Sequence, residues 1–217
     1  YAELMRRSEN WRNVINPKRG WADGRHQNGK WEGNTDLVHR KSYITEGATC
    51  HYTWYVPQNI QGLFNVINKS VDKSAKCLNR NVQGISQSDT MSAVVSRLDK
   101  MFDEGLYWHG NEPCHQVAYL YDAAGAPWKT QQRIHHILNT EYNDTPGGLS
   151  GNDDAGQMSA WYVFSAIGFY PVCPSTPYYY IGTPSFDKVT FNLENGKKFE
   201  IQAHGVGDRV FYIQKSL

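Results

Sequence analysis

A succession of amphipathic stretches, each bounded by Gly, Pro or polar residues, most limits how this chain can fold. The clearest runs over 89–104, where apolar residues recur at the 3/4 spacing of one helix face: Met91, Val94, Val95, Leu98, Met101 and Phe102. Residues 1–15 are interpreted as the end of a helix, and further helices are predicted over 57–67, 72–81, 113–124, 127–142 and 154–169. Successive helices joined by short turns are typical of a helical barrel, solenoid or bundle. Spacing alone does not distinguish these three.

The pattern changes after Pro171. Three short runs, 178–181, 188–191 and 199–203, are rich in aromatic and β-branched residues. Glu194-Asn-Gly196 lies between the last two and is typical of a hairpin turn. The sequence therefore predicts a mainly α chain, with a helical region over 1–172 and a small antiparallel β segment over 173–217. Residues 16–43 show no periodicity, which indicates a long irregular excursion.

Charge and cysteine spacing exclude several classes of protein. The 22 basic and 21 acidic residues nearly cancel, which argues against a nucleic-acid or anionic-membrane surface. No apolar run is long enough to cross a membrane. The four cysteines have no Cys-x-x-Cys spacing, which disfavours a zinc ribbon or a thioredoxin-type site. Asn68-Lys-Ser70 and Asn143-Asp-Thr145 match the N-glycosylation pattern and favour a secreted or endomembrane (vacuolar) location.

The segment Gly148-Leu-Ser-Gly-Asn-Asp-Asp-Ala-Gly-Gln-Met-Ser-Ala-Trp161 places two carboxylates in a glycine-bracketed loop before a predicted helix. Asp154 is expected to open that helix, where free amides and the helix dipole stabilise a negative charge suited to a general base. The open alternative is that Asp153 or Asp154 only caps the helix. One apolar stripe of the helix is expected to face the core: Ala160, Val163, Phe164 and Ile167.

Two more acidic positions, Glu46 and Glu112, occur in loops before predicted helices. Aromatic residues follow Glu46, and a carboxyl beside such rings is expected to be poorly solvated and to stay protonated. Asn111 and Glu112 offer the oxygen donors that Ca²⁺ prefers, although Asn111 could equally cap a helix. His109, Cys114 and His115 lack the usual spacing of zinc ligands.

Four ordered motifs give the chain a family resemblance. Besides the segment from Gly148, they are Thr45-Glu-Gly-Ala-Thr-Cys-His-Tyr-Thr-Trp-Tyr-Val-Pro57, Tyr107-Trp-His-Gly-Asn-Glu-Pro-Cys-His115 and Tyr119-Leu-Tyr-Asp-Ala-Ala-Gly-Ala-Pro-Trp-Lys-Thr-Gln131. The chain resembles glycoside hydrolase family 92, calcium-dependent inverting exo-α-mannosidases, from about Trp11 to its end. The resemblance implies the later part of an (α/α)6 toroid. The N-terminal β-sandwich and the early helices of the family are then expected outside this chain.

The resemblance also implies roles for individual residues. Glu46 is expected to be the catalytic acid and Asp154 the base, with Asn152 at the position where some members carry a second acid. Because Asn152 cannot take a proton, the base role falls on Asp154 alone. Calcium is expected at Asn111 and Glu112. Residues expected to contact the sugar are Trp54, Trp108, His109 and Asp153.

The predicted function is the removal of terminal α-linked mannose, with α-1,2 linkages expected, from mannose-containing glycans such as N-glycans. Inversion requires the two carboxyls to lie roughly 6.5–9.5 Å apart, so that one water fits between base and sugar. The alternative is a non-catalytic carbohydrate-binding or scaffolding fragment that keeps the fold but lacks the rest of the active site.

Overall fold

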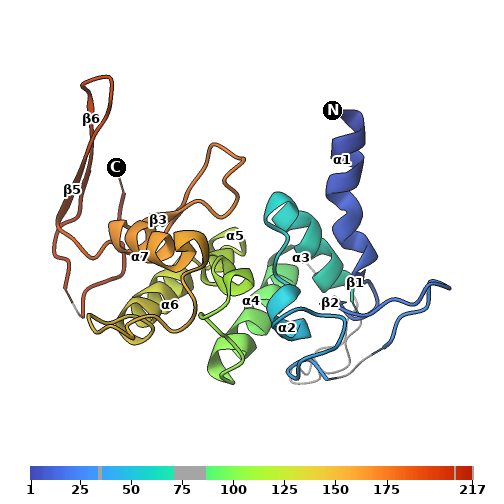
Figure 1. The fold of residues 1–217 in the computed structure, drawn as a ribbon. Helices are drawn as coiled ribbons and strands as arrows, with labels where there is room; N and C mark the ends of the chain where they lie inside the picture. Colours follow the sequence, from blue (N-terminus) through green and yellow to red (C-terminus); the bar gives the residue numbers. More distant parts are fainter. Residues whose placement is uncertain (34–35, 71–86, 208, 217) are drawn as a thin grey trace. The chain divides into compact units, whose positions relative to one another are not determined.

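The computed structural model describes residues 1–33, 36–70, 87–207 and 209–216. It is mostly helical, with small antiparallel β pairs (Figure 1). The chain divides into two compact units, Tyr1–Val117 and Ala118–Leu217. This division differs from the predicted boundary at 172/173, which stays a prediction. In the part of the chain that is described, no helix is long and apolar enough to span a membrane.

The first unit contains the following elements: α1 Ala2–Ser8, η1 Glu9–Asn13, β1 Ile15–Asn16, β2 Trp21–Ala22, α2 Thr49–Tyr52, η2 Pro57–Asn59, α3 Ile60–Lys69, α4 Gln87–Asp103 and η4 Glu112–Cys114. The predicted helices over 57–67 and 89–104 are confirmed. The helix predicted over 72–81 lies outside the described residues.

Helices α3 and α4 pack together and contribute to the core of the first unit. Helix α3 begins where the Asn59 side chain accepts a hydrogen bond from the Gly62 amide at 2.9 Å, which satisfies one of the free amides of the first turn. The side chains buried at the contact recur at the 3/4 spacing of the sequence pattern: Leu63, Phe64 and Ile67 on α3, and Val94, Leu98 and Met101 on α4.

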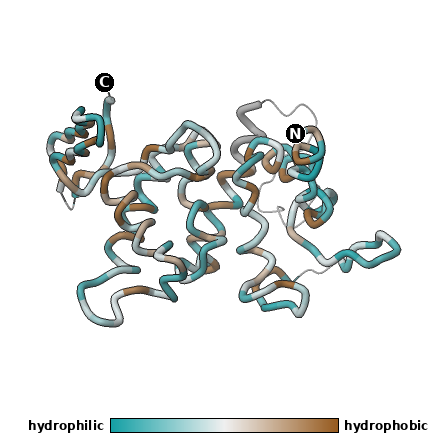
Figure 2. The backbone as a smooth tube through the Cα atoms, turned by 45° about the horizontal axis from the view of Figure 1, so that its top comes forward, coloured by the Kyte–Doolittle hydropathy of each residue, from teal (hydrophilic) through white to brown (hydrophobic). Residues whose placement is uncertain are grey.

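The irregular excursion after residue 16 is broken by the short antiparallel pair β1–β2, which the sequence did not predict. Trp21 in β2 is buried and contacts Trp54 edge-on, with ring centroids 6.4 Å apart. Residues 24–32 then extend as a mainly hydrophilic loop (Figure 2). The pair β1–β2 thus connects the N-terminal segment to the core that carries α2.

The second unit contains these elements: the end of η5 Val117–Tyr119, then α5 Leu120–Ala123, α6 Pro127–Thr140, η6 Asp154–Gly156, α7 Gln157–Ile167, β3 Phe169–Tyr170, β4 Tyr180–Ile181, β5 Lys188–Asn192 and β6 Lys198–Gln202. The helix predicted over 113–124 is divided into the short pieces η4, η5 and α5. Its predicted apolar face is nonetheless buried, namely Val117, Leu120, Tyr121 and Ala124.

The apolar stripe predicted for α7 is wrong. Val163 is 54% exposed and Ala160 is also exposed, whereas the helix buries Met158, Trp161, Ser165 and Ala166. Trp161 decides the orientation, because it stacks on Tyr142 with ring centroids 5.9 Å apart and planes at 4°. A helix that is apolar on most sides gives no clear preference for one face, so the largest ring determines which face is buried.

The described β segments of the second unit form two antiparallel pairs. The hairpin β5–β6 aligns Val189 with Ile201, and Gly196 has the positive φ of +77° that its turn needs, as predicted. Strand β3 was not predicted; it pairs with β4, aligning Phe169 with Ile181. It follows Gly168, whose φ of +111° ends α7 and reverses the chain.

Candidate active site

The loop that carries Glu46 has an unusual backbone. Glu46 adopts φ +62°, in the left-handed region that residues with a Cβ rarely enter. A Cβ on Gly47 would lie 2.8 Å from the Tyr52 ring, so only glycine fits there. The Tyr52 hydroxyl donates to the Thr45 carbonyl at 2.5 Å. The side chains that follow Glu46 in sequence therefore hold its loop in this conformation.

His51 ties the same loop to a second segment of the first unit. Its Nδ1 accepts a hydrogen bond from the Ala48 amide at 3.1 Å, so Nε2 carries the proton and donates to the Leu106 carbonyl at 3.0 Å. Burial lowers the pKa of His51, and the bond to Leu106 only partly opposes this. A neutral ring thus connects α2 to the segment with Trp108, whose ring centroid lies 5.9 Å from that of His51.

The Tyr52 hydroxyl lies among the predicted acid and the predicted metal ligands. Burial raises its pKa, and the charges of Glu46 and Glu112 add to the effect, while the Asn111 amide opposes it. Helix α2 and η4, which Glu112 opens, are also in contact. Tyr52 is therefore near enough to the predicted acid and metal ligands for Glu46, Asn111 and Glu112 to influence its hydroxyl.

Solvation of Glu46 differs from the prediction. The carboxyl was expected to be poorly solvated beside aromatic rings, but the residue is exposed in the first unit. Gly47, and not Glu46, lies against the rings of Tyr52 and His51.

The oxygen donors at Asn111 and Glu112 suit the chemistry of Ca²⁺ but supply only two ligands of the six to eight that the ion takes. Asn111 is 5% exposed, and its Nδ2 is buried without a well-formed hydrogen bond to any described residue. Its side chain makes no capping bond to η4, so the alternative cap role is not observed. Among the described residues there is no cluster of three or more His, Cys, Asp or Glu side chains placed to hold a metal.

Two of the residues expected to contact sugar lie in the core of the first unit. Trp54 and His109 are each 1% exposed. The Tyr107 hydroxyl is 2.7 Å from Nδ1 of His109, and burial lowers the pKa of His109 to about 3. In this unit neither ring has a face open for stacking. Trp108, by contrast, is 41% exposed and has ring surface available to a ligand.

The acidic loop of the second unit is arranged differently from the prediction. Asp153 and Asp154 are both exposed, but α7 begins only at Gln157. Asp153 accepts hydrogen bonds from the amide and hydroxyl of Ser159 at 3.0 and 2.6 Å, and these bonds lower its pKa. Gly156 occupies the N-cap position of α7, and Asp153 accepts a hydrogen bond from the third amide of the helix, while the Asp154 carboxylate accepts no hydrogen bond from the residues described. Asn152 is exposed next to them.

Backbone strain marks both acidic loops. Among the described residues, Glu46 and Ala155 are the two non-glycine residues with positive φ, at +62° and +54°. Ala155 follows Asp154 directly, and Gly156 after it is also left-handed, so the chain turns sharply before α7. Strained residues of this kind cluster at functional sites, because the surrounding structure must hold them in place.

A family model decides the identity of the chain. The model of the glycosyl hydrolase family 92 catalytic domain matches residues 1–216. The chain belongs to glycosyl hydrolase family 92.

Solved structures of family 92 agree with this assignment. The α-mannosidase BT3965 of Bacteroides thetaiotaomicron is 39% identical, with a TM-score of 0.80 over 98% of this chain and 26% of its own. The inverting mannosidase BT2199 of the same species is 32% identical, with a TM-score of 0.78 over 95% of this chain and 28% of its own. A curated relative, an uncharacterized secreted glycosidase of Arthroderma benhamiae, is 26% identical over 88% of this chain and 25% of its own length. The chain thus spans about a quarter of each of these relatives.

Sequence reasoning missed two positioning residues of this family 92 chain. His51 and Tyr52 appeared only as aromatic neighbours of Glu46, yet they fix its loop. The signal available was the spacing of Ala48 and His51, because a side chain three residues after a helix cap can return to the cap amide.

Proposed function

We propose that this chain carries the acid and base of an inverting exo-α-mannosidase, with Glu46 as the acid and Asp154 as the base. The observation that carries the proposal is the backbone strain described above. The two left-handed non-glycine residues coincide with the two loops that the family resemblance marks as catalytic. Strain on the order of 1–3 kcal/mol at each position favours a functional role over a chance loop conformation.

The proposed chemistry divides proton transfer between the two loops. Glu46 gives its proton to the oxygen of the leaving group, and Asp154 takes a proton from the water that attacks the opposite face of the sugar. Glu46 and Asp154 are exposed in their own units, and neither carboxylate forms a hydrogen bond or ion pair with a described side chain, so each is available to a ligand. The two carboxyls are expected roughly 6.5–9.5 Å apart in the assembled site, because one water must fit between base and sugar.

Calcium belongs to the same proposal. Asn111 and Glu112 would hold it through the amide and carboxylate oxygens, and further ligands would come from other groups. When bound, the ion supplies positive charge to the sugar hydroxyls. The exposed Trp108, which contacts His51, is proposed to pack against the sugar. Asp153 and the buried His109 and Trp54 are proposed to support the loops around the sugar. The proposed substrate is terminal α-1,2-linked mannose on secreted or vacuolar N-glycans.

The proposal is tested by Glu46→Gln with two substrates. Turnover of an unactivated mannoside is expected to fall by about 10²–10⁴-fold, because leaving-group protonation is lost. A dinitrophenyl mannoside, whose leaving group needs no proton, is expected to lose far less. Glu104→Gln, the same exchange at an exposed Glu of the first unit, is the matched control and should change neither rate. Equal losses on both substrates would exclude Glu46 as the acid.

Metal dependence is tested separately. Activity is expected to disappear on chelation with EGTA and to return with Ca²⁺ more fully than with Zn²⁺, because Asn111 and Glu112 are oxygen donors. Activity that persists after exhaustive chelation contradicts the calcium assignment. The non-catalytic alternative makes a different prediction, namely mannoside binding without turnover in wild-type protein that contains Ca²⁺.

A further inference from the structure

The two N-glycosylation patterns of the sequence lie in very different surroundings. Asn68 belongs to α3, and its Oδ1 is buried without a hydrogen-bond partner among the described residues. The Ser70 hydroxyl of the same triplet donates to the Ile67 carbonyl at 2.5 Å, so it is engaged with the helix and not with Asn68. Asn68 is half-buried, and this first triplet is held in the last turn of α3 with its hydroxyl directed to the helix backbone.

The second triplet lies in an exposed loop between α6 and α7. Asn143, Asp144 and Thr145 are all exposed. Oδ1 of Asn143 accepts hydrogen bonds from the Thr145 amide at 3.0 Å and from the Thr145 hydroxyl at 2.5 Å. Both bonds use the oxygen of the amide, and Nδ2 makes no hydrogen bond to any described residue. A substituent on Nδ2 would therefore break none of the contacts that shape the loop.

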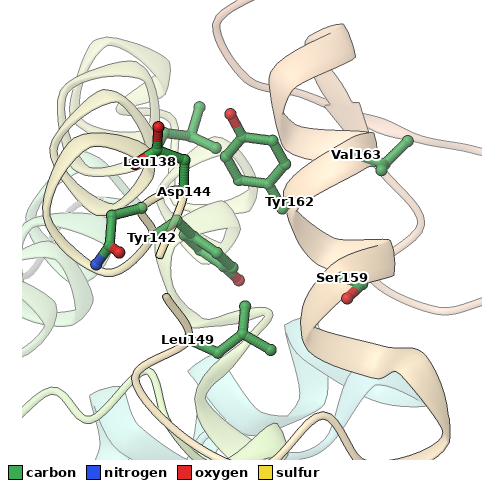
Figure 3. Close-up of a pocket in the computed structure, with 8 residues that line it drawn as sticks. Leu138, Tyr142, Asp144, Leu149, Ser159, Tyr162 and Val163 are labelled. Carbon is green, nitrogen blue, oxygen red and sulfur yellow. The ribbon is translucent and has the colours of Figure 1, made fainter. Parts of the chain in front are cut away.

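The neighbourhood of Asn143 also has room for a sugar. The residue lines an open pocket of about 390 Å³ in the second unit. Figure 3 shows the rings of Tyr142 and Tyr162 and the side chain of Leu149 facing the space beside α7. Tyr162 is 40% and Leu149 37% exposed, and such apolar surfaces suit the apolar face of a sugar ring. Asn143 thus combines a free amide nitrogen with unobstructed space.

We propose that Asn143 is an N-glycosylation site and that Asn68 is not. The co-reactant is an oligosaccharide linked to a lipid pyrophosphate, brought by an oligosaccharyl transferase. A bond forms between Nδ2 of Asn143 and the anomeric carbon, and the bond from that carbon to the pyrophosphate oxygen breaks. The lipid pyrophosphate leaves and the amide loses one proton, so no oxidant or reductant is needed. Thr145 positions the acceptor by holding Oδ1.

The test uses the protein secreted from a eukaryotic host that attaches N-glycans. Peptide mapping after enzymatic removal of N-glycans in ¹⁸O-water is expected to show conversion to labelled Asp at position 143 and not at position 68. The glycan-dependent mass shift is expected to disappear in Asn143→Gln and in Thr145→Ala, and to remain in Thr145→Ser and in Asn68→Gln. Thr145→Ser keeps the hydroxyl and controls for general damage to the loop.

Three outcomes would overturn the proposal. They are an unmodified position 143 in the secreted wild-type protein, a shift that survives Asn143→Gln, and a labelled position 68. Peptide mapping of the wild-type protein needs no variant, so a variant that fails to fold leaves the test intact. The result is independent of the proposed mannosidase activity, because it is read from mass and not from turnover.

Discussion

Replacing Glu46 by glycine is expected to stabilise the protein while removing its proposed acid. The residue has φ +62° and an exposed side chain, so the substitution relieves backbone strain and loses little packing. A left-handed conformation costs a residue with a Cβ about 1–2 kcal/mol. Glycine avoids that cost but loses about 0.5–1 kcal/mol more backbone entropy on folding. The difference predicts a gain of up to about 1.5 kcal/mol in the free energy of unfolding, with a central value of about 0.75 kcal/mol.

The assay compares three variants by urea denaturation, followed by tryptophan fluorescence. Glu46→Ala removes the carboxyl but keeps the Cβ, so its free energy of unfolding is expected to match that of the wild type. Glu46→Gly is expected to exceed Glu46→Ala, and both should lose mannoside turnover equally. Ala155→Gly applies the same reasoning to the second loop, at φ +54°. A Glu46→Gly variant less stable than Glu46→Ala would refute the claim that this position is strained.

Two further predictions concern buried titratable groups. Burial raises the pKa of Asp122 to about 7 from 3.8, so the stability it contributes is complete below pH 3.8 and is lost as the pH rises towards 7. Asp122→Asn is therefore expected to raise the free energy of unfolding at pH 7 by on the order of 1–3 kcal/mol, with no gain at pH 3.5. Urea denaturation at the two pH values measures this difference. A gain of equal size in Asp187→Asn, the same exchange at an exposed residue, would contradict the prediction. Burial lowers the pKa of His109 to about 3 from 6.5, so its contribution is complete above pH 6.5 and falls with the pH, by at most about 1.4 kcal/mol per pH unit. His109→Asn is expected to flatten the decline in unfolding free energy between pH 6.5 and 4, and an unchanged slope would contradict the assignment to His109.

Periodicity predicted the helices that bury one narrow face. Val94, Leu98 and Met101 are buried on α4 because the large apolar residues of that helix recur at the 3/4 spacing of one face, so only one orientation hides apolar surface. The β5–β6 hairpin was also predicted from the sequence, because Asn195 and Gly196 are residues that favour the tight turn between two short strands. In both places the local pattern and the packing agree.

Helix α7 shows where this reasoning fails. It carries apolar residues around most of its circumference, and the buried face is chosen by the stack of Trp161 on Tyr142 from a distant part of the sequence. Strand β3 was missed for a similar reason, because its two residues pair with β4 only after Gly168 has reversed the chain. Contacts with a different segment of the chain decide both features, and the residue pattern within each element does not predict such contacts.

The candidate site was found through its residue types, but its conformation was not. Glycine and asparagine are the residues that sequence rules place in the left-handed region, whereas Glu46 and Ala155 occupy it here. A glutamate in a sequence does not predict a positive φ. The values follow from side chains that hold each loop at its ends, and those contacts become visible only in three dimensions.

Each of the two acidic loops is held by a pair of hydrogen bonds. In the first, Tyr52 binds the Thr45 carbonyl and His51 binds the Ala48 amide, so the strained Glu46 lies between two fixed points. In the second, Asp153 binds Ser159 through both carboxylate oxygens, and the strained Ala155 lies between them. Each net hydrogen bond contributes about 0.5–1.5 kcal/mol, so two bonds suffice to offset the strain at one residue. A carboxylate held in this way keeps its place without being buried, which leaves Glu46 and Asp154 open to a substrate.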